Sequence, residues 1–276
     1  MKIHILTENL TYKRGLLCEH GLSLLIESGQ GRWLFDSGQT DAFVKNAKAM
    51  GVSLDDLDGI VLSHGHYDHC GGMKTLFALA KKEQKELPPV YVRAAGFEKK
   101  YAQKGGAVKE EIGIPWAMSE CESLRLIRED TYKIAPGVWL MGNISYQPQL
   151  EDVSPGMFVL QDGEFKKDPM SDEQLLVFET AEGLCVFAGC SHLGILNCLY
   201  AVRERFPGQR IHSLLAGMHL MHASTERIER TIEQLKQQDV DLIFPVHCTG
   251  LPAIARMRSQ LPDRVRRAEC GSVICI

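Results

Sequence analysis

The six residues 64–69 (HGHYDH) constrain this chain more than any other part of its 276 residues. They follow the apolar stretch 59–63 (GIVLS) and precede Gly71-Gly72, which predicts a loop between a buried strand and a helix. Imidazoles two positions apart in an extended turn can share one ion, and the next turn can direct a carboxylate and a further imidazole to a neighbouring position. A chance cluster of solvated polar residues is the alternative. We favour a metal site formed by His64, His66, Asp68 and His69.

The donor types in this cluster indicate which metals to expect. Histidine and carboxylate side chains suit zinc, manganese or iron better than the oxygen-rich sites of calcium and magnesium. Two metal ions a few ångströms apart are a common arrangement for activating water and stabilising an oxyanion. We therefore expect two divalent metal ions as cofactors, with zinc as the first choice and manganese or iron as alternatives.

Short apolar segments alternate with amphipathic ones along the chain. Helices are predicted at 40–50, after Met73, after His192 and at 225–238. Strands are predicted at 22–26, 32–36, 59–63, 90–94, 137–141, 157–160, 174–180, 184–189, 211–216 and 241–246. This order predicts an α/β layered architecture with functional residues in the loops at strand ends. We expect one domain over residues 1–276, and we interpret the Lys-, Glu- and Gly-rich stretch 96–132 as an insertion or lid over the site.

The 64–69 cluster resembles the H-x-H-x-D-H motif of the metallo-β-lactamase superfamily. Residues 34–38 (LFDSG) are similar to the superfamily's upstream D-x-G segment, whose aspartate (here Asp36) supports the metal loop. The resemblance covers most of the chain. It implies a four-layer αββα sandwich with a dinuclear site at one edge of the packed sheets.

The chain departs from the superfamily pattern at the third histidine, because no histidine lies between His69 and His192. Cys190 stands where the superfamily has a bridging aspartate or cysteine, and His192 follows two residues later. We expect His192 to be the missing ligand, since a catalytic zinc usually has three protein ligands. His247, at the end of an apolar strand, matches the superfamily's last ligand. For Cys190, ligation and simple packing of a buried thiol stay equally open.

This variant resembles one branch of the superfamily, the archaeal 7,8-dihydropterin-6-methyl-4-(ribofuranosyl)aminobenzene 5′-phosphate synthases. The segments that match are Glu8-Asn9, residues 19–23 (EHGLS), residues 217–220 (GMHL) and residues 247–250 (HCTG). His219 is a candidate for contacting the substrate, donating a proton or ligating a metal, against a structural role beneath its loop. Asp36 is expected to orient a ligand. His20 alone among the remaining histidines has some prospect of lining the site, whereas His222 is expected to be structural or exposed.

Composition excludes several other classes of protein. The net charge of −4 gives no support for a nucleic-acid partner or a polybasic membrane anchor. No apolar run approaches the roughly 20 residues of a membrane span, and the N-terminal apolar stretch is too short for a signal peptide. The nine cysteines are scattered singly, without a C-x-x-C pair. We expect a cytoplasmic protein acting on a small molecule. The oligomeric state stays open.

Four functions compete for this sequence. We favour a hydrolase in which a dinuclear site activates water against a phosphoryl or carbonyl centre, with Asp68 and His219 as catalytic candidates. A transferase or synthase using a pterin pyrophosphate is the second, as the branch resemblance implies. Di-iron redox chemistry and a non-catalytic metal-binding module are less favoured. No G-x-S-x-G, P-loop or G-x-G-x-x-G motif supports another chemistry.

Overall fold

The computed structural model describes residues 1–106, 108–151 and 156–276 and arranges most of them in two large sheets. The first sheet has the strand order β17-β1-β2-β3-β4-β5-β8. Its strands are β17 (Val273–Cys275), β1 (Lys2–Thr7), β2 (Ser23–Ser28), β3 (Gly31–Phe35), β4 (Gly59–Val61), β5 (Val90–Arg93) and β8 (Leu124–Ile127). Strands β3, β4, β5 and β8 run parallel to one another, and the others pair antiparallel.

The second sheet has the order β16-β15-β14-β13-β10-β9. It consists of β16 (Val240–Pro245), β15 (Ile211–Ala216), β14 (Gly183–Ala188), β13 (Leu175–Thr180), β10 (Val138–Met141) and β9 (Thr131–Ala135). The predicted hairpin at 174–189 is confirmed as β13 and β14, paired antiparallel. Its side chains alternate between two apolar clusters. Leu176 and Phe178 face the first sheet, whereas Leu175 and Val177 face the helices on the other side.

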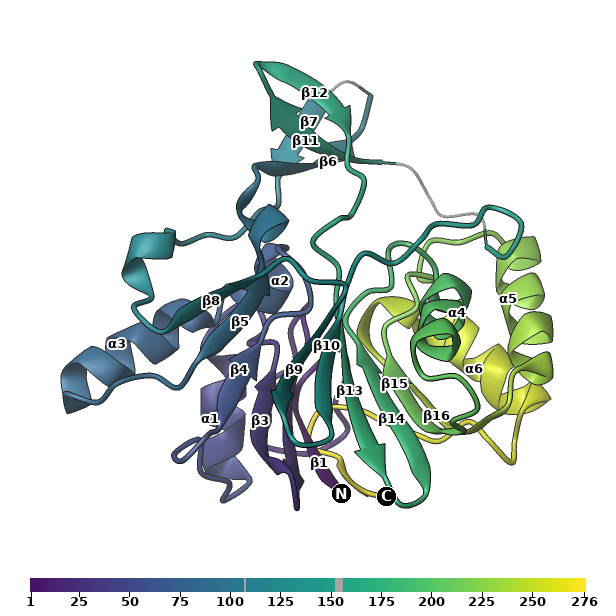
Figure 1. The fold of residues 1–276 in the computed structure, drawn as a ribbon, viewed down its shortest axis with the longest axis horizontal. Coiled ribbons are helices and arrows are strands. Elements are labelled where there is room, and N and C mark those ends of the chain that lie inside the picture. Colours follow the sequence, from purple (N-terminus) through teal and green to yellow (C-terminus); the bar gives the residue numbers. More distant parts are fainter. Residues whose placement is uncertain (107, 152–155) are drawn as a thin grey trace.

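Helices cover the outer face of each sheet, so the molecule has four layers (Figure 1). Helices α1 (Ala42–Ala49) and α3 (Met73–Glu83) pack on the first sheet, and their apolar side chains complete one core cluster. Helices α4 (Ile195–Arg205), α5 (Thr225–Gln237) and α6 (Leu251–Gln260) pack on the second. A third cluster fills the space between the sheets. The expected αββα sandwich is confirmed.

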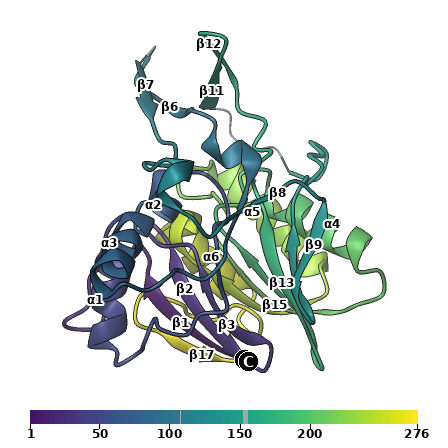
Figure 2. The same ribbon diagram turned by 60° about the vertical axis from the view of Figure 1, so that its left-hand side comes forward.

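A small four-stranded sheet stands above one end of the sandwich (Figures 1 and 2). Its order is β12-β11-β6-β7, with β6 (Lys100–Lys104), β7 (Val108–Glu111), β11 (Met157–Gln161) and β12 (Glu164–Lys167). The stretch 96–132 is thus divided, because β6 and β7 join this sheet while β8 extends the first large sheet. The small sheet also recruits residues 157–167, outside the expected insertion. Its role as a lid stays a prediction.

Both chain termini lie at the opposite end of the sandwich from the small sheet (Figure 1). Among the described residues, no helix combines the length and the apolar composition that crossing a bilayer requires. The short helix α2 (Tyr67–Cys70) lies at the same end as the small sheet and carries part of the histidine-rich loop.

Candidate metal centre

The loop after β4 turns sharply because two glycines let backbone segments approach closely. A Cβ on Gly65 would lie 2.2 Å from the carbonyl oxygen of Gly96, and one on Gly72 would lie 2.0 Å from that of Ser37. Neither contact is possible for a larger residue. The chain therefore passes from β4 through the short loop 62–66 into α2, and it presents the side chains of His64, His66, Asp68 and His69 at one edge of the sandwich.

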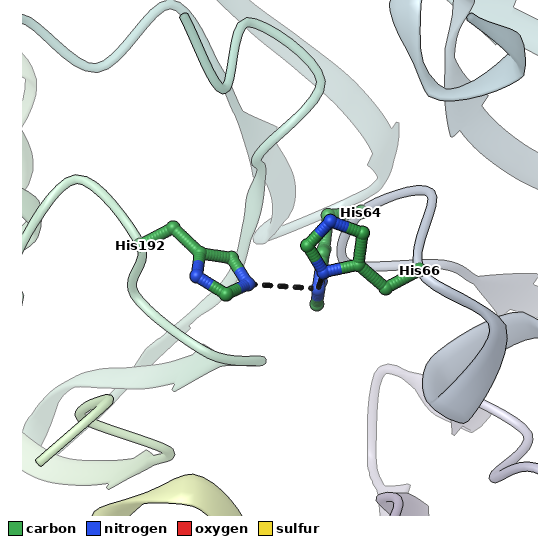
Figure 3. A group of neighbouring side chains, drawn as sticks. All are labelled: His64, His66 and His192. Carbon is green, nitrogen blue, oxygen red and sulfur yellow. Dashed lines mark hydrogen bonds between the residues drawn. The ribbon is translucent and has the colours of Figure 1, made fainter. Parts of the chain in front are cut away.

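Three imidazoles from two different sheets form the first group (Figure 3). His64 and His66 follow β4 in the first sheet, and His192 follows β14 in the second. His64 Nε2 lies 3.0 Å from His66 Nδ1 and 3.2 Å from His192 Nε2. Two nitrogens bound to one tetrahedral zinc at 2.0–2.1 Å are about 3.3 Å apart. The three side chains therefore fit a shared metal ion.

Burial keeps this first group in the form that binds metals. It lowers the pKa of His64 and His192 well below the ordinary value and that of His66 to about 3. Neutral imidazoles have a free lone pair, so no proton has to leave these rings before an ion binds. Ser63 Oγ lies 2.9 Å from His64 Nδ1 and thereby helps to orient the ring, leaving Nε2 directed at the other two histidines.

A second group surrounds the carboxylate of Asp68. Its Oδ2 lies 3.4 Å from His247 Nε2, 3.7 Å from His69 Nε2 and 3.3 Å from His20 Nε2. Burial opposes a charge on Asp68, but His69 and His247 hold the pKa of this carboxyl well below its usual range. The group therefore has an anionic oxygen and two buried imidazoles that converge beside the first position.

Buried polar groups outside the ligand set hold this second group in place. Asp36 accepts hydrogen bonds from Ser63 N and Oγ at 2.7 Å each and contacts His69 Nδ1 at 2.6 Å. Burial opposes protonation of His69, yet Asp36 and Asp68 raise its pKa to about 9. Asn9 Oδ1 lies 2.7 Å from His247 Nδ1. Both rings thus direct Nε2 toward the centre, the arrangement usual for metal-ligating histidines.

Cys190 lies between the two groups. Its Sγ is 3.2 Å from His69 Nε2, and it shares a cluster of potential ligand atoms with His64 and His69. His219 lies next to this cluster, with its ring centroid 4.5 Å from that of His192. All seven predicted ligand residues, together with His219, therefore meet in one region of the molecule.

Several residues that contact this cluster had no individual role predicted from the sequence. Cys248 is one, because its Sγ accepts a hydrogen bond from His219 N at 3.2 Å. Glu8 accepts the backbone N–H of His247 at 3.2 Å, and Glu173 accepts that of His192 at 2.6 Å. Glu8 belongs to the Glu8-Asn9 segment after β1, whose match to the synthase branch is a signal in the sequence. Nothing in the sequence around Glu173 distinguishes it from a surface residue.

A cavity of about 450 Å³ opens onto the cluster. Five predicted ligands line it, together with Ala102, Glu110 and Met157 of the small sheet. His219, the exposed His222 and Arg227 also line it. The cavity therefore brings a small molecule within reach of both groups of potential metal ligands.

Comparison with known proteins identifies related sequences along nearly the whole chain. The family model described as the metallo-beta-lactamase superfamily matches residues 17–247. A 7,8-dihydropterin-6-methyl-4-(beta-D-ribofuranosyl)-aminobenzene-5′-phosphate synthase from Methanocaldococcus jannaschii is 29% identical over 99% of this chain and 96% of its own. An uncharacterized protein from the same organism is 32% identical over 95% of this chain and 96% of its own.

A solved structure of the same superfamily is similar to this chain along its whole length. The crystal structure of Tm1679, a metal-dependent hydrolase of the beta-lactamase superfamily, matches this chain with a TM-score of 0.84. The two sequences are 31% identical, and the match covers 100% of this chain and 99% of Tm1679. The similarity therefore includes the small sheet as well as the sandwich.

Proposed function

Because this chain belongs to the metallo-β-lactamase superfamily, we propose that it is a metal-dependent hydrolase acting on a phosphoryl or carbonyl centre of a small molecule. The observation that carries the proposal is the adjacency of two ligand groups, His64, His66 and His192 beside Asp68, His69 and His247. Divalent ions so held lower the pKa of water and stabilise the negative charge that develops during attack. We propose zinc at both positions.

The remaining cavity residues support binding of an anionic group. His219 Nδ1 and Arg227 Nε are buried and have no hydrogen-bond partner within the described residues. Both side chains line the cavity, so a phosphate or carboxylate oxygen placed there would satisfy these nitrogens. His219 is then placed to orient the reacting group or to give a proton to the departing oxygen. The small sheet would limit the access of bulk water.

The match to the M. jannaschii synthase favours a second candidate, a synthase of the same type. In that reaction the residues of the centre would assist departure of pyrophosphate from a pterin substrate. The two candidates share a site and differ in the acceptor, which is water in a hydrolase and a second organic molecule in a synthase. Substrate tests therefore separate them better than any argument from ligand geometry.

The proposal is tested by metal analysis together with a substrate screen. Protein purified without chelator and reconstituted with zinc, manganese or iron should hold two ions per chain, as measured by elemental analysis. It should hydrolyse at least one of a panel of phosphodiesters, phosphomonoesters and lactones. A reproducible content of one ion or none at saturating metal contradicts the dinuclear centre. Turnover of pterin pyrophosphate only in the presence of an amine acceptor favours the synthase.

A further inference from the structure

Three consecutive residues just before β13 join the two sheets at the metal centre. Gln174 donates a backbone hydrogen bond to Ser63 O at 2.8 Å, and its side chain donates to Leu62 O at 2.8 Å. These contacts run from the second sheet to the end of β4 in the first sheet. Asp172 and Glu173 precede Gln174 and are both almost completely buried.

Asp172 holds the loop that carries the first two histidines. Its Oδ2 accepts the backbone N–H of Gly65 at 2.7 Å, and Gly65 stands between His64 and His66. Its Oδ1 accepts a hydrogen bond from Lys100 Nζ at 2.8 Å, and Lys100 also contacts Asp168 at 2.7 Å. The acceptor for Gly65 is therefore itself fixed by a buried charge from the small sheet.

Glu173 holds the loop that carries the third histidine. Its Oε1 accepts the backbone N–H of His192 at 2.6 Å, and its Oε2 accepts that of Leu193 at 3.1 Å. A carboxylate that accepts two adjacent N–H groups fixes both the position and the direction of the backbone at that point.

We propose that Asp172 and Glu173 are positioning residues for the first metal site, and this inference rests on the proposed metal-dependent function. One carboxylate fixes the His64–His66 loop and its neighbour fixes the His192 loop, so two adjacent residues set the separation of ligands that come from different sheets. Neither side chain is assigned to the metal itself. Replacing either carboxylate is expected to change the distances between His64, His66 and His192, while all three imidazoles remain as donors.

The test measures metal affinity at each position separately. Metal-free protein is titrated with cobalt(II) and zinc against a chromophoric chelator, and the first position is defined as the one that His192→Ala loses. Glu173→Gln keeps one acceptor for two N–H groups. It should lower the metal affinity of the first position about 10–100-fold, the usual effect of losing a partner that supports a metal ligand. Glu173→Leu and Asp172→Ala should weaken it at least as much, with the second position within about twofold of wild type.

Glu151→Gln is the matched control. Glu151 is buried to the same degree and accepts the backbone N–H of Leu196 at 3.0 Å, three residues beyond Leu193. It should leave both affinities unchanged. In the Glu173 variants, the visible absorption of cobalt(II) at the first position should also shift, because the ligand geometry changes. A merely structural role would lower the melting temperature without moving this spectrum.

Wild-type affinity at both positions in Glu173→Gln overturns the inference, as does equal weakening of both positions or the same loss in Glu151→Gln. A wild-type protein that binds fewer than two ions overturns it together with the proposed function. A wild-type protein that binds two ions but hydrolyses nothing in the screen contradicts only the hydrolase, and the affinities of the variants still decide the role of Asp172 and Glu173.

Discussion

Backbone conformations that side-chain-bearing residues rarely adopt gather at the candidate metal centre. Asp36, Ser191, His219 and His247 all have positive φ angles, between 48° and 59°. Each left-handed residue costs roughly 1–2 kcal/mol, and such residues persist only where the surrounding structure fixes them. All four follow the end of a strand. The left-handed turn lets the chain reverse there, so that the side chain or its neighbour faces the centre.

His192 lies where the chain departs from the usual spacing of its superfamily, and its substitution tests the proposed first metal position most directly. His192→Ala should remove one of the three donors of the first position, and metal titration should show loss of that ion. Cys190→Ser retains the volume of the side chain but replaces a soft donor with a hydroxyl. It should weaken binding less, by roughly the 10–100-fold typical of a supporting contact.

Retention of both ions at wild-type affinity in His192→Ala would place the third donor elsewhere, and His219 would be the next residue to test. If Cys190→Ser instead loses an ion completely, the thiolate is itself a ligand. The two variants therefore separate a direct donor from a residue that only packs beside the donors.

Asp68 supplies the negative charge of the second group. Asp68→Ala should lower the turnover of the best substrate by at least about 100-fold, the scale seen when one group that stabilises transition-state charge is removed. The fold should persist, because Asp68 lies at an edge of the sandwich and not in its apolar clusters. Circular dichroism and thermal melting report on the fold. Near-wild-type turnover would show that the reaction takes place elsewhere.

At the scale of elements, the small sheet is joined to the sandwich by a buried charge. Lys100 on β6 is 1% exposed and pairs with Asp168 and Asp172, which lie between β12 and β13. Burial opposes its charge, but Asp172 and Asp168 raise the pKa of Lys100 above its usual value. The ammonium group compensates the charge of the two carboxylates, and a buried charge without such a partner would destabilise the fold.

Lys100→Met should therefore reduce the free energy of unfolding by about 3–5 kcal/mol, the range for breaking a buried ion pair. Lys104→Met is the matched control on the same strand. Its ammonium pairs with Glu110, but the lysine side chain is 71% exposed, so its loss should cost at most about 1 kcal/mol. Chemical denaturation measures both. Equal losses of unfolding free energy in the two variants would mean that the buried ion pairs of Lys100 stabilise the fold no more than an exposed pair does.

The elements differ in how well the sequence predicts them. Strands β13 and β14 are continuous apolar runs joined by a short turn, so local pattern alone identifies their hairpin. The small sheet is different, because β6 pairs with β11 across a long sequence separation and β12 is exposed along its length. Without a buried face, such a strand has no hydrophobic alternation to reveal it.

The residues of the candidate centre also differ in how well the sequence predicts them. The closely spaced histidines after β4 can be recognised in the sequence as a potential metal site. His192 could be proposed because a metal with two imidazoles needs a further donor, and Cys190 because it stands where the superfamily has a bridging aspartate or cysteine. Asp172, Glu173 and Cys248 are different. Asp172 reaches Gly65 only because the two sheets pack face to face, and Glu173 and Cys248 contact the ends of neighbouring strands of the second sheet that are distant in sequence. Long-range packing of this kind leaves no periodic signal in one sequence.

At the scale of the whole molecule, the candidate ligands connect the two halves of the sandwich. The first sheet supplies the histidines and the aspartate that follow β4, whereas the second supplies Cys190, His192 and His247 after β14 and β16. An ion bound by residues of both sheets opposes their separation. Metal binding should thus stabilise the global fold and not one loop alone.

Removal of metal by a chelator followed by dialysis should accordingly lower the melting temperature. A ligand at 100 times its dissociation constant stabilises the native state by about 2.7 kcal/mol, and about 2–4 °C per kcal/mol is expected for a chain slightly shorter than this one. Because two ions are removed, the shift should be on the order of 10–20 °C, and calorimetry should show its recovery when zinc is restored. In a double variant lacking His192 and His247, added zinc should have little effect. An unchanged melting temperature after complete loss of metal would mean that the two sheets pack equally well without the ions.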